Sequence, residues 1–404
     1  MRVLYVAQGY PEDGRTGGLI AAFYCIVQLA RAGHRVTVLS LLADGSPDVP
    51  PAALTSVADV IAVRGIPVSS PARYAANLLD PLPWPIRRYA SKRLGAEAVR
   101  LLRADGFDLV VFNSLHSATL LPLIRSLSGA PCVLLAHNVQ STIMRLYARF
   151  QRNPLARVYA TIQWRKMLRF ETRSLPAFDL VAAFSEVDAR DLRALAPAAN
   201  VVAAALAVDV RRLAAVSRPE DLDLLLFAYY GWAPNVDALV WFLDEVFPVV
   251  RRLRPGTRAT VAGGGMPARL CRRLAATEHV DFVGSPPSAA DTYARARVVA
   301  VPLRIGSGVR VKIIEAMAMG RAIVSTSKGC EGLDVRSGEH LAVADSPEEF
   351  AAAAVRLLDD TAERERLGER ARALALARHD ALGAGRPIVR ECEELVRRSG
   401  SGRP

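Results

Sequence analysis

Short apolar runs rich in β-branched residues alternate with longer helical patterns along the whole chain, and this alternation restricts the fold more than any other feature. Several runs are apolar throughout, as expected of parallel strands that helices cover on both faces. A helical pattern at 19–32 ends at Gly33, a residue typical of helix C-termini. In the first half of the chain the expected strands are 3–7, 35–41, 109–113, 132–136, 180–184 and 201–205.

The pattern restarts after residues 209–223, a charged, proline-containing stretch that we interpret as a linker. The expected strands of the second half are 224–230, 258–262, 280–283, 298–302, 322–326 and 341–344. The expected helices are 235–253, 266–276, 288–296, 309–319, 347–358, 361–378 and 385–398. Two consecutive series of this kind predict an α/β protein with two doubly wound, Rossmann-like domains that face each other across a cleft. We place the domains at 1–208 and 224–380, with a final helix in 381–404 that packs back towards the first domain.

The chain carries a net charge of +12, and the excess is confined to two stretches. Residues 71–104 contribute a net +5 and residues 141–174 a net +7, so the rest of the chain is formally neutral. Such an excess indicates an anionic partner. A nucleic-acid-binding protein is one alternative, but no recognised nucleic-acid motif is present and we expect no nucleic acid as partner.

Cysteine usage and hydropathy indicate the compartment. The five cysteines are odd in number, lie at least 59 residues apart and lack metal-ligand or redox spacing, which is typical of free thiols in a reducing compartment. The apolar part of the N-terminus is too short for a signal peptide, and no run reaches the ~18 apolar residues that span a bilayer. We therefore expect a cytoplasmic protein that is soluble or peripheral on the inner face of a membrane.

Ligands of open α/β sheets bind beyond the carboxyl ends of the strands. Gly17 and Gly18 follow the first strand at the start of a helix, where backbone amides suit a phosphate or a sugar, although a plain turn has the same pattern. The dinucleotide spacing G-x-G-x-x-G is absent, which argues against a dehydrogenase. His137 follows the strand at 132–136, where it would donate a hydrogen bond or transfer a proton, or serve only as a structural histidine.

The strongest single pattern is a strand, a Gly306-Ser307-Gly308 loop and a helix. Arg310 and Lys312 lie in the expected first turn of that helix, where the helix dipole disfavours cations. Their placement therefore predicts a bound polyanion. Glu315 lies one turn further on and would accept hydrogen bonds from sugar hydroxyls. The alternative is a surface ion pair between Lys312 and Glu315.

This segment resembles the C-terminal signature of the family 4 glycosyltransferases, retaining enzymes with the two-domain GT-B fold. The resemblance extends over nearly the whole chain, since further motifs of the family follow in the expected order. They are Gly17-Gly18, His137-Asn138-Val139, Phe184-Ser185-Glu186 with Asp188, Gly231–Asp237, Val261–Gly265, Val280–Gly284 and Gly306–Gly320.

The resemblance implies transfer of a sugar from a nucleotide diphosphate donor with retention of the anomeric configuration. The donor would bind to the second domain and the acceptor, a glycolipid, polysaccharide or natural product, to the first. Two departures stand out. Ser307 occupies the position of the first of two glutamates that the family usually spaces eight residues apart, and Glu315 matches the second. The arginine and lysine that often follow the first strand of the second domain are missing from the loop 230–235.

We expect Arg310 and Lys312 to replace that missing pair as a metal-independent clamp for the diphosphate, with the nucleotide sugar as co-substrate and no further cofactor. The expected catalytic residues are His137, Arg310, Lys312 and Glu315, and the expected donor-binding residues are Gly17, Gly18, Asn235, Gly284, Ser307, Gly308 and Val309. Two alternatives on the same fold are a nucleotide-sugar epimerase and a non-catalytic subunit. A phosphorylase-like enzyme is a variant of the first.

The basic stretches also suggest where the acceptor is found. Seven of the eight basic residues in 141–174 are interleaved with aromatic and aliphatic residues; they are Arg145, Arg149, Arg152, Arg157, Arg165, Lys166 and Arg169. Such a helix can lie in the interface of an anionic bilayer. We expect a lipid-linked or small-molecule acceptor. The alternative is that the apolar residues form the domain core and the arginines are only solvated.

Overall fold

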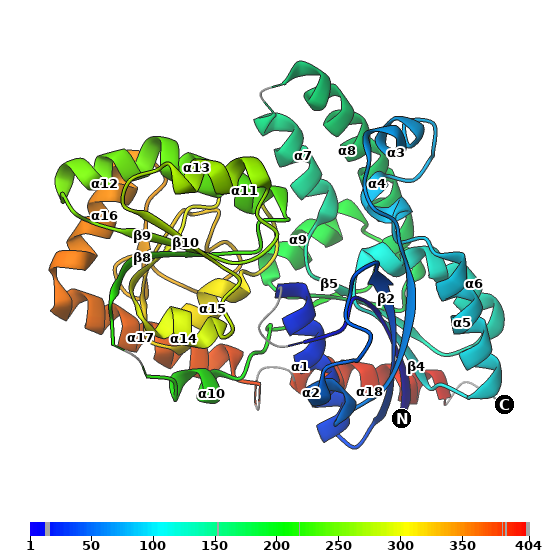
Figure 1. Cartoon of the computed structure of the whole chain (residues 1–404). Helices are drawn as coiled ribbons and strands as arrows, with labels where there is room; N and C mark the ends of the chain where they lie inside the picture. Colours follow the sequence, from blue (N-terminus) through cyan, green and yellow to red (C-terminus); the bar gives the residue numbers. More distant parts are fainter. Residues whose placement is uncertain (13–16, 152, 218, 382, 384–385, 401–404) are drawn as a thin grey trace. The chain divides into compact units, whose positions relative to one another are not determined.

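The computed structural model describes residues 1–12, 17–151, 153–217, 219–381, 383 and 386–400 (Figure 1). Residues 13–16, which precede Gly17, and Arg152 of the second basic stretch lie outside the described residues. The chain forms two compact units. The N-terminal unit consists mainly of residues 18–206 and the C-terminal helix, and the second unit consists mainly of residues 207–384.

The N-terminal unit contains a sheet of seven parallel strands in the order β3-β2-β1-β4-β5-β6-β7. Its strands are β1 (Arg2–Gln8), β2 (Arg35–Ala43), β3 (Asp59–Ile66), β4 (Leu109–Phe112), β5 (Cys132–Ala136), β6 (Leu180–Ala183) and β7 (Val201–Ala203). Strand β3 was not predicted from the sequence; it is an edge strand whose residues are mostly only partly buried. The strand order reverses between β1 and β4, which creates a topological switch point there.

Helices surround this sheet. They are α1 (Gly17–Arg31), α2 (Ala52–Thr55), α3 (Pro71–Ala76), α4 (Trp84–Arg87), α5 (Lys92–Ala104), α6 (Leu121–Leu127), α7 (Gln140–Phe150), α8 (Pro154–Ser174), α9 (Glu186–Leu195) and α18 (Arg386–Gly400), with 3-10 turns at Leu115–Leu120 and Leu175–Ala177. Gly33 ends α1 with φ of +83°, as its C-terminal position predicts.

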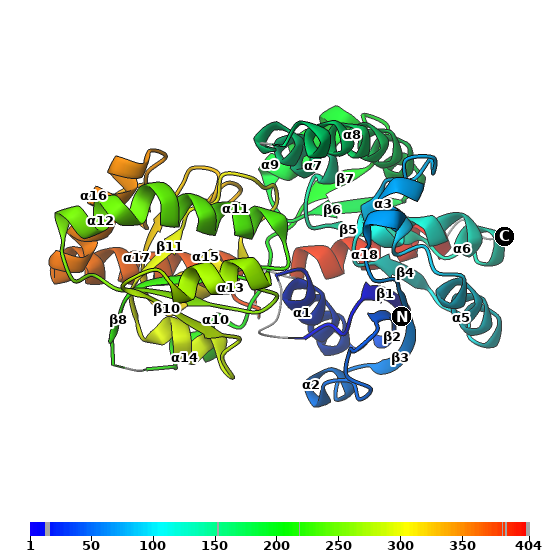
Figure 2. The same cartoon turned by 45° about the horizontal axis from the view of Figure 1, so that its top comes forward.

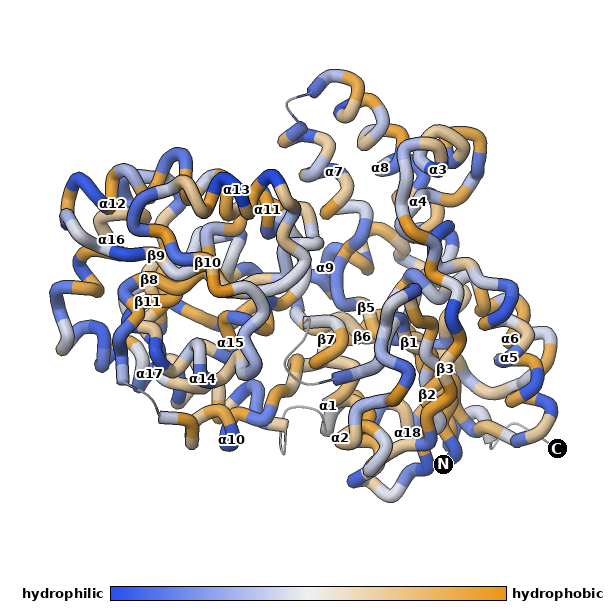
Figure 3. The backbone as a smooth tube through the Cα atoms, in the orientation of Figure 1, coloured by the Kyte–Doolittle hydropathy of each residue, from blue (hydrophilic) through white to orange (hydrophobic). Residues whose placement is uncertain are grey.

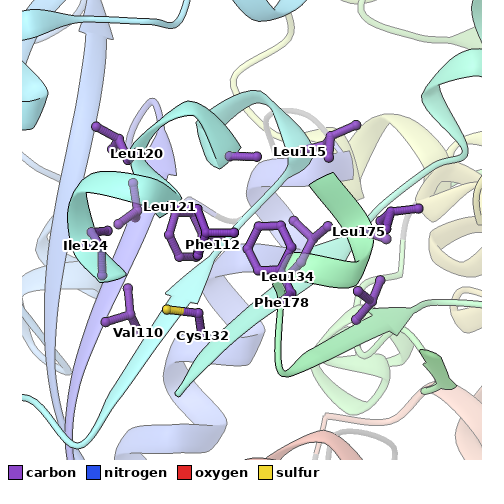
Figure 4. Packing of buried hydrophobic residues seen from close by; sticks show 14 of the residues in the cluster. Val110, Phe112, Leu115, Leu120, Leu121, Ile124, Cys132, Leu134, Leu175 and Phe178 are labelled. Atoms are coloured by element: carbon purple, nitrogen blue, oxygen red, sulfur yellow. The ribbon is translucent and has the colours of Figure 1, made fainter. Parts of the chain in front are cut away.

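Alternate residues of the strands face opposite sides of the sheet. Leu4, Phe112 and their neighbours pack against α5 and α6, and the Phe112 and Phe178 rings meet edge to face at 5.2 Å (Figure 4). Tyr5 points the other way, towards Cys25 of α1 and Cys392 of α18. The N-terminal unit therefore includes the last helix of the chain.

The second unit contains six parallel strands in the order β10-β9-β8-β11-β12-β13. The strands are β8 (Leu222–Phe227), β9 (Ala259–Ala262), β10 (Val280–Gly284), β11 (Ala296–Val301), β12 (Ala322–Ser325) and β13 (Ala342–Val343). Here the order reverses between β8 and β11. Figure 3 shows that the strands of both units are mostly apolar, as continuous burial requires.

The helices of the second unit are α10 (Val210–Ala214), α11 (Ala233–Trp241), α12 (Phe247–Leu253), α13 (Ala268–Ala275), α14 (Ala289–Ala294), α15 (Val311–Ala318), α16 (Pro347–Asp359) and α17 (Thr361–His379) (Figure 2). A π turn at Phe242–Val246 joins α11 to α12, so the helix expected at 235–253 is continuous. The π turn accommodates Pro248, which has no amide hydrogen to donate to the helix.

The expected linker at 209–223 is partly folded. Its residues 210–214 form α10, which Asp209 caps by accepting a hydrogen bond from the Arg212 amide at 3.0 Å. Val210 and Leu213 of this helix are buried, so a charged segment still has an apolar side. All five cysteines are free thiols, and all but Cys271 are buried. None of the described helices combines the length and apolar composition needed to cross a bilayer.

The fold class is therefore confirmed: both units are doubly wound, with helices around a parallel sheet.

Candidate functional site

The first candidate site lies at the switch point of the second unit, beyond the carboxyl ends of β8 and β11. A narrow crevice of about 20 Å³ is present there, and Asn235 and Lys312 both line it. Asn235 comes from the start of α11, after β8, and Lys312 from the start of α15, after β11. The two loops that follow the central strands thus meet at the position where open α/β sheets bind ligands.

Lys312 and Asn235 are joined directly. Lys312 Nζ donates to Asn235 Oδ1 at 3.0 Å, and Asn235 Nδ2 donates to the Tyr229 carbonyl at 2.8 Å. Burial, followed by the nearby Arg310 charge, lowers the pKa of Lys312 to about 7, and Glu315 partly opposes this shift. An ammonium group with so little solvation gains strongly from an anion placed beside it.

Arg310 is placed differently from expectation. The helix begins at Val311, so Arg310 is the N-cap residue and not part of the first turn. Its Nη1 donates to the carbonyls of Ser307 and Gly308, the latter at 2.7 Å. Arg310 is buried, and its guanidinium fills the space where a Cβ on Gly306 would lie. The structure thus gives Arg310 a role in shaping the loop.

Glu315 is buried one turn after Lys312. A pair between Lys312 and Glu315 would therefore not be a solvent-exposed one. Ser307 is buried in the same loop, Gly308 has a φ of +83°, and Val309 is the last residue before the cap. Gly284 is further away in the topology, because it ends the edge strand β10.

A second link, which was not predicted from the sequence, joins the same two loops. Arg304, after β11, pairs with both carboxylate oxygens of Asp237 on α11, at 2.9 and 3.2 Å. The Arg304 guanidinium also lies over the Trp241 ring, 5.4 Å from its centroid. The arrangement fixes α11 beside the glycine-rich loop. In the sequence, the pair was indicated only by the opposite charges of Asp237 and Arg304, which lie 67 positions apart.

The second candidate site lies at the switch point of the N-terminal unit, at the carboxyl ends of β1, β4 and β5. Asn113 Oδ1 accepts from the Tyr5 hydroxyl at 2.8 Å and from His137 Nε2 at 3.1 Å. The His137 ring stacks on Phe184, with 5.0 Å between the centroids. Burial lowers the pKa of His137 to about 4, so the ring is neutral at pH 7.

His116, a second histidine of the same unit, was not predicted as a site residue. The Ser114 hydroxyl donates to Gln8 Oε1 at 2.8 Å and contacts His116 Nδ1 at 3.1 Å. The His116 ring meets Tyr89 edge to face at 5.1 Å. Burial, and then the charges of Arg88 and His137, lower the pKa of His116 to about 4. Its position after a strand, like that of His137, was the available signal.

Gly18 lies in the first turn of α1, after β1, and a Cβ there would meet nothing within 4 Å. Gly17 is the exposed first residue of the same helix. The motif Ser185 to Asp188 has a structural role, since Ser185 Oγ accepts from the Asp188 amide at 3.0 Å and caps α9. Within the described residues, no group of three or more His, Cys, Asp or Glu is arranged to hold a metal ion.

Two family models match the two units separately. Residues 20–212 match the model "Glycosyltransferase Family 4", and residues 224–360 match "Glycosyl transferases group 1". The chain belongs to the family 4 (group 1) glycosyltransferases. The resemblance inferred from the motifs is thereby confirmed.

Solved structures similar to this glycosyltransferase cover almost its whole length. HepE from Anabaena, solved with UDP and glucose, aligns over 97% of this chain and 99% of its own, with a TM-score of 0.69 and 16% identity. Sucrose-phosphate synthase from Thermosynechococcus elongatus aligns over 100% of both chains, with a TM-score of 0.75 and 17% identity. WaaG, a glycosyltransferase involved in lipopolysaccharide biosynthesis, has a TM-score of 0.66 and 16% identity over 97% of this chain and 99% of its own. These likenesses support the GT-B fold.

Among curated sequences, an uncharacterized 44.6 kDa protein in the cps region of Klebsiella pneumoniae is 29% identical over 124 residues. The match covers 29% of this chain and about a third, 32%, of the Klebsiella protein.

Proposed function

We propose that this glycosyltransferase moves a hexosyl or related sugar from a nucleotide diphosphate donor to its acceptor with retention of configuration. The observation that carries the proposal is the poorly solvated Lys312 ammonium, which lies with Arg310 at the start of α15, beside the switch point of the second unit. A diphosphate is the anion that this arrangement suits, because the first amides of α15 and the cations would act on it together. The HepE structures with UDP and with UDP-glucose support a donor of this class.

In the proposed reaction the bond between the anomeric carbon and the diphosphate oxygen breaks, and the diphosphate leaves with the electron pair. The acceptor oxygen forms the new bond on the same face and loses its proton to the departing phosphate oxygen. Arg310, Lys312 and the amides of Gly308 and Val309 stabilise the charge of the leaving group, so no metal ion is needed. Glu315 accepts hydrogen bonds from the ribose hydroxyls. Gly17, Gly18, Asn235, Gly284 and Ser307 complete the proposed donor contacts.

We assign the polar cluster of the N-terminal unit to sugar hydroxyls of the acceptor or the transferred sugar. With a pKa of about 4, His137 is a poor proton carrier at pH 7, because general catalysis works best when the pKa is near the operating pH. Its role is therefore to orient a hydroxyl group by hydrogen bonding.

For the acceptor we propose a lipid-linked or membrane-proximal saccharide, met by a cytoplasmic enzyme bound to the inner face of an anionic membrane. The observation in favour is the location of the charge, since both basic stretches belong to the N-terminal unit. Co-sedimentation with anionic and neutral vesicles at low and high salt tests the attachment. Equal, negligible binding to both would leave a soluble small-molecule acceptor.

A panel of nucleotide sugars tests the reaction. We expect slow release of nucleoside diphosphate from one donor without acceptor, faster release with acceptor, and activity that persists in a metal chelator. Proton NMR of the first product then reports the anomeric configuration. An epimerised donor without release would establish the epimerase, and absence of donor binding would favour a non-catalytic subunit. An inverted product, or a strict requirement for magnesium, would contradict the proposed mechanism.

A further inference from the structure

Seven of the twelve large apolar side chains that are exposed in the described part of the chain belong to two short segments, 68–79 and 150–158. They are Val68, Tyr74, Leu78, Leu79, Phe150, Leu155 and Val158. Single exposed leucines are common in soluble proteins, but a group of them on neighbouring segments indicates a binding surface. Every residue of the short helix α3 is exposed, and five of its six residues are apolar or aromatic.

The helix α3 lies next to α8, the helix whose first turn belongs to the segment 150–158 (Figures 1 and 2). The rings of Tyr74 and Tyr159 meet edge to face at 5.8 Å, and Gln163 Nε2 donates to Asn77 Oδ1 at 2.9 Å. Lys166 Nζ donates to the carbonyls of Asn77, Leu78 and Asp80, at 2.6 to 3.0 Å. These bonds hold the Leu78–Leu79 turn against α8, so its apolar side chains are presented on a fixed backbone.

Charge around this apolar surface is mainly positive, and Asp80, which follows Leu79, is paired with Arg87 at 2.9 Å. Arg73, Arg145, Arg149, Arg157 and Arg165 are exposed on α3, α7 and α8. The segment 66–79 contains no acidic residue, and Glu171 is the only one in 138–178. Glu171 is buried, where it accepts hydrogen bonds from the amides of Gln140 and Ser141 at the start of α7.

Along the exposed face of α8 the side chains change from apolar to basic with distance from the first turn. Leu155 and Val158 come first, and Arg165 and Arg169 follow on the same face at helical spacing. Val158 and Arg165 are separated by seven residues, or roughly 10 Å of helix. Because Lys166 holds the Leu78–Leu79 turn beside the middle of α8, a bilayer that Leu79, Leu155 and Val158 reach together lies along this face of the helix. Interfacial helices bury their apolar side by ~5–10 Å in this orientation, with the arginines of the same face at headgroup level.

We propose that Tyr74, Leu78, Leu79, Leu155 and Val158 form an apolar apex that inserts into the headgroup–acyl boundary of an anionic bilayer, with the surrounding arginines on lipid phosphates. The inference rests on the proposed membrane attachment and gives it a defined surface. A second copy of the chain fits less well, because a two-fold contact through this face would oppose arginines to arginines. An acidic partner surface would match the arginines but not a protruding Leu79, which is 94% exposed.

The test compares L79D/L155D with V49D in sedimentation with phosphatidylglycerol-containing and pure phosphatidylcholine vesicles. Val49 is the matched control, since it is 78% exposed in the same unit but belongs to neither segment. We expect wild type and V49D to bind anionic vesicles, with part of the binding retained at high salt. In L79D/L155D the partition coefficient should fall tenfold or more at both salt concentrations. All three proteins should keep the same melting temperature and rate of donor hydrolysis, because these side chains touch neither candidate site.

Equal binding of L79D/L155D and wild type to anionic vesicles would overturn the apex while leaving the electrostatic attachment in place. If the wild type does not bind anionic vesicles, both the apolar apex and the electrostatic attachment are contradicted. Analytical ultracentrifugation tests for a second copy on this surface. If the wild type is a dimer that does not bind vesicles, and L79D/L155D is a monomer, the surface is a dimer interface and the proposal is overturned.

Discussion

Lys312 Nζ donates a hydrogen bond to Asn235 Oδ1 across 3.0 Å, joining two residues that are 77 positions apart in the chain. Each follows one of the two central strands of the second sheet, β11 and β8. The bond holds the ammonium group at the start of α15, where burial brings its pKa to about 7. The same geometry therefore gives Lys312 both a fixed position and a protonation state that a bound anion can change.

Donor binding should take up protons at pH 8. Free Lys312 is largely neutral above pH 7, and a bound diphosphate favours the ammonium form and raises the pKa. The dissociation constant of the donor should then rise with pH above about 7, by up to ~10-fold per unit. Calorimetry in two buffers with different ionisation enthalpies measures the uptake. Lys312→Arg is always charged, so uptake that persists in this variant would assign the proton elsewhere.

Removing either cation should slow the reaction. Arg310→Ala and Lys312→Ala are each expected to reduce turnover by ~100-fold or more, the usual effect of losing one group that stabilises a developing oxyanion. Arg310→Ala should also lower the melting temperature, because its guanidinium holds the Ser307 and Gly308 carbonyls. The exposed Arg336 of the same unit supplies the control variant, Arg336→Ala. Near-normal turnover in both site variants would place the clamp elsewhere.

Glu315→Gln should act mainly on donor binding. The amide keeps the size of the side chain but is a weaker acceptor for ribose hydroxyls than a carboxylate. We expect the Michaelis constant for the donor to rise ~10-fold while turnover changes little. Initial rates over a range of donor concentrations separate the two constants. A loss confined to turnover would instead place Glu315 at the leaving group.

His116 and His137 should make the stability of the protein sensitive to acid. Their folded-state pKa of about 4 lies below the unfolded value of ~6.5, so the unfolded chain binds more protons between these values and stability falls as the pH drops through this window. Each histidine should contribute about 2 kcal/mol to the loss between pH 7 and pH 5. Urea unfolding of wild type, His116→Gln and His137→Gln at both pH values measures this loss. An unchanged loss in the variants would attribute acid sensitivity to other groups.

For His137→Ala the expected outcome at pH 7 is lower turnover with little change in melting temperature. A large loss of stability would favour a structural role through Asn113 and Phe184.

Much of the fold was predictable because strands buried on both faces must be apolar throughout. The runs at 132–136 and 180–184 carry that pattern and form β5 and β6. The strand β3 was missed because it is an edge strand with exposed positions, among them Asp59. Residues 210–214 were interpreted as linker for a similar reason: a short helix needs only Val210 and Leu213 on its buried side.

The sequence by itself determined the class of fold, most of its strands and helices in their order, and the loops that follow the central strands. These follow from local periodicity, from turn residues such as Gly33 and from motifs within single loops. Only the tertiary structure decided which side chains of different loops meet. The Lys312–Asn235 bond, the Arg304–Asp237 pair and the contact between α3 and α8 each join residues far apart in the chain. Side-chain spacing within one segment carries no record of such partners, because burial and hydrogen bonding of polar groups depend on the packing of the whole unit.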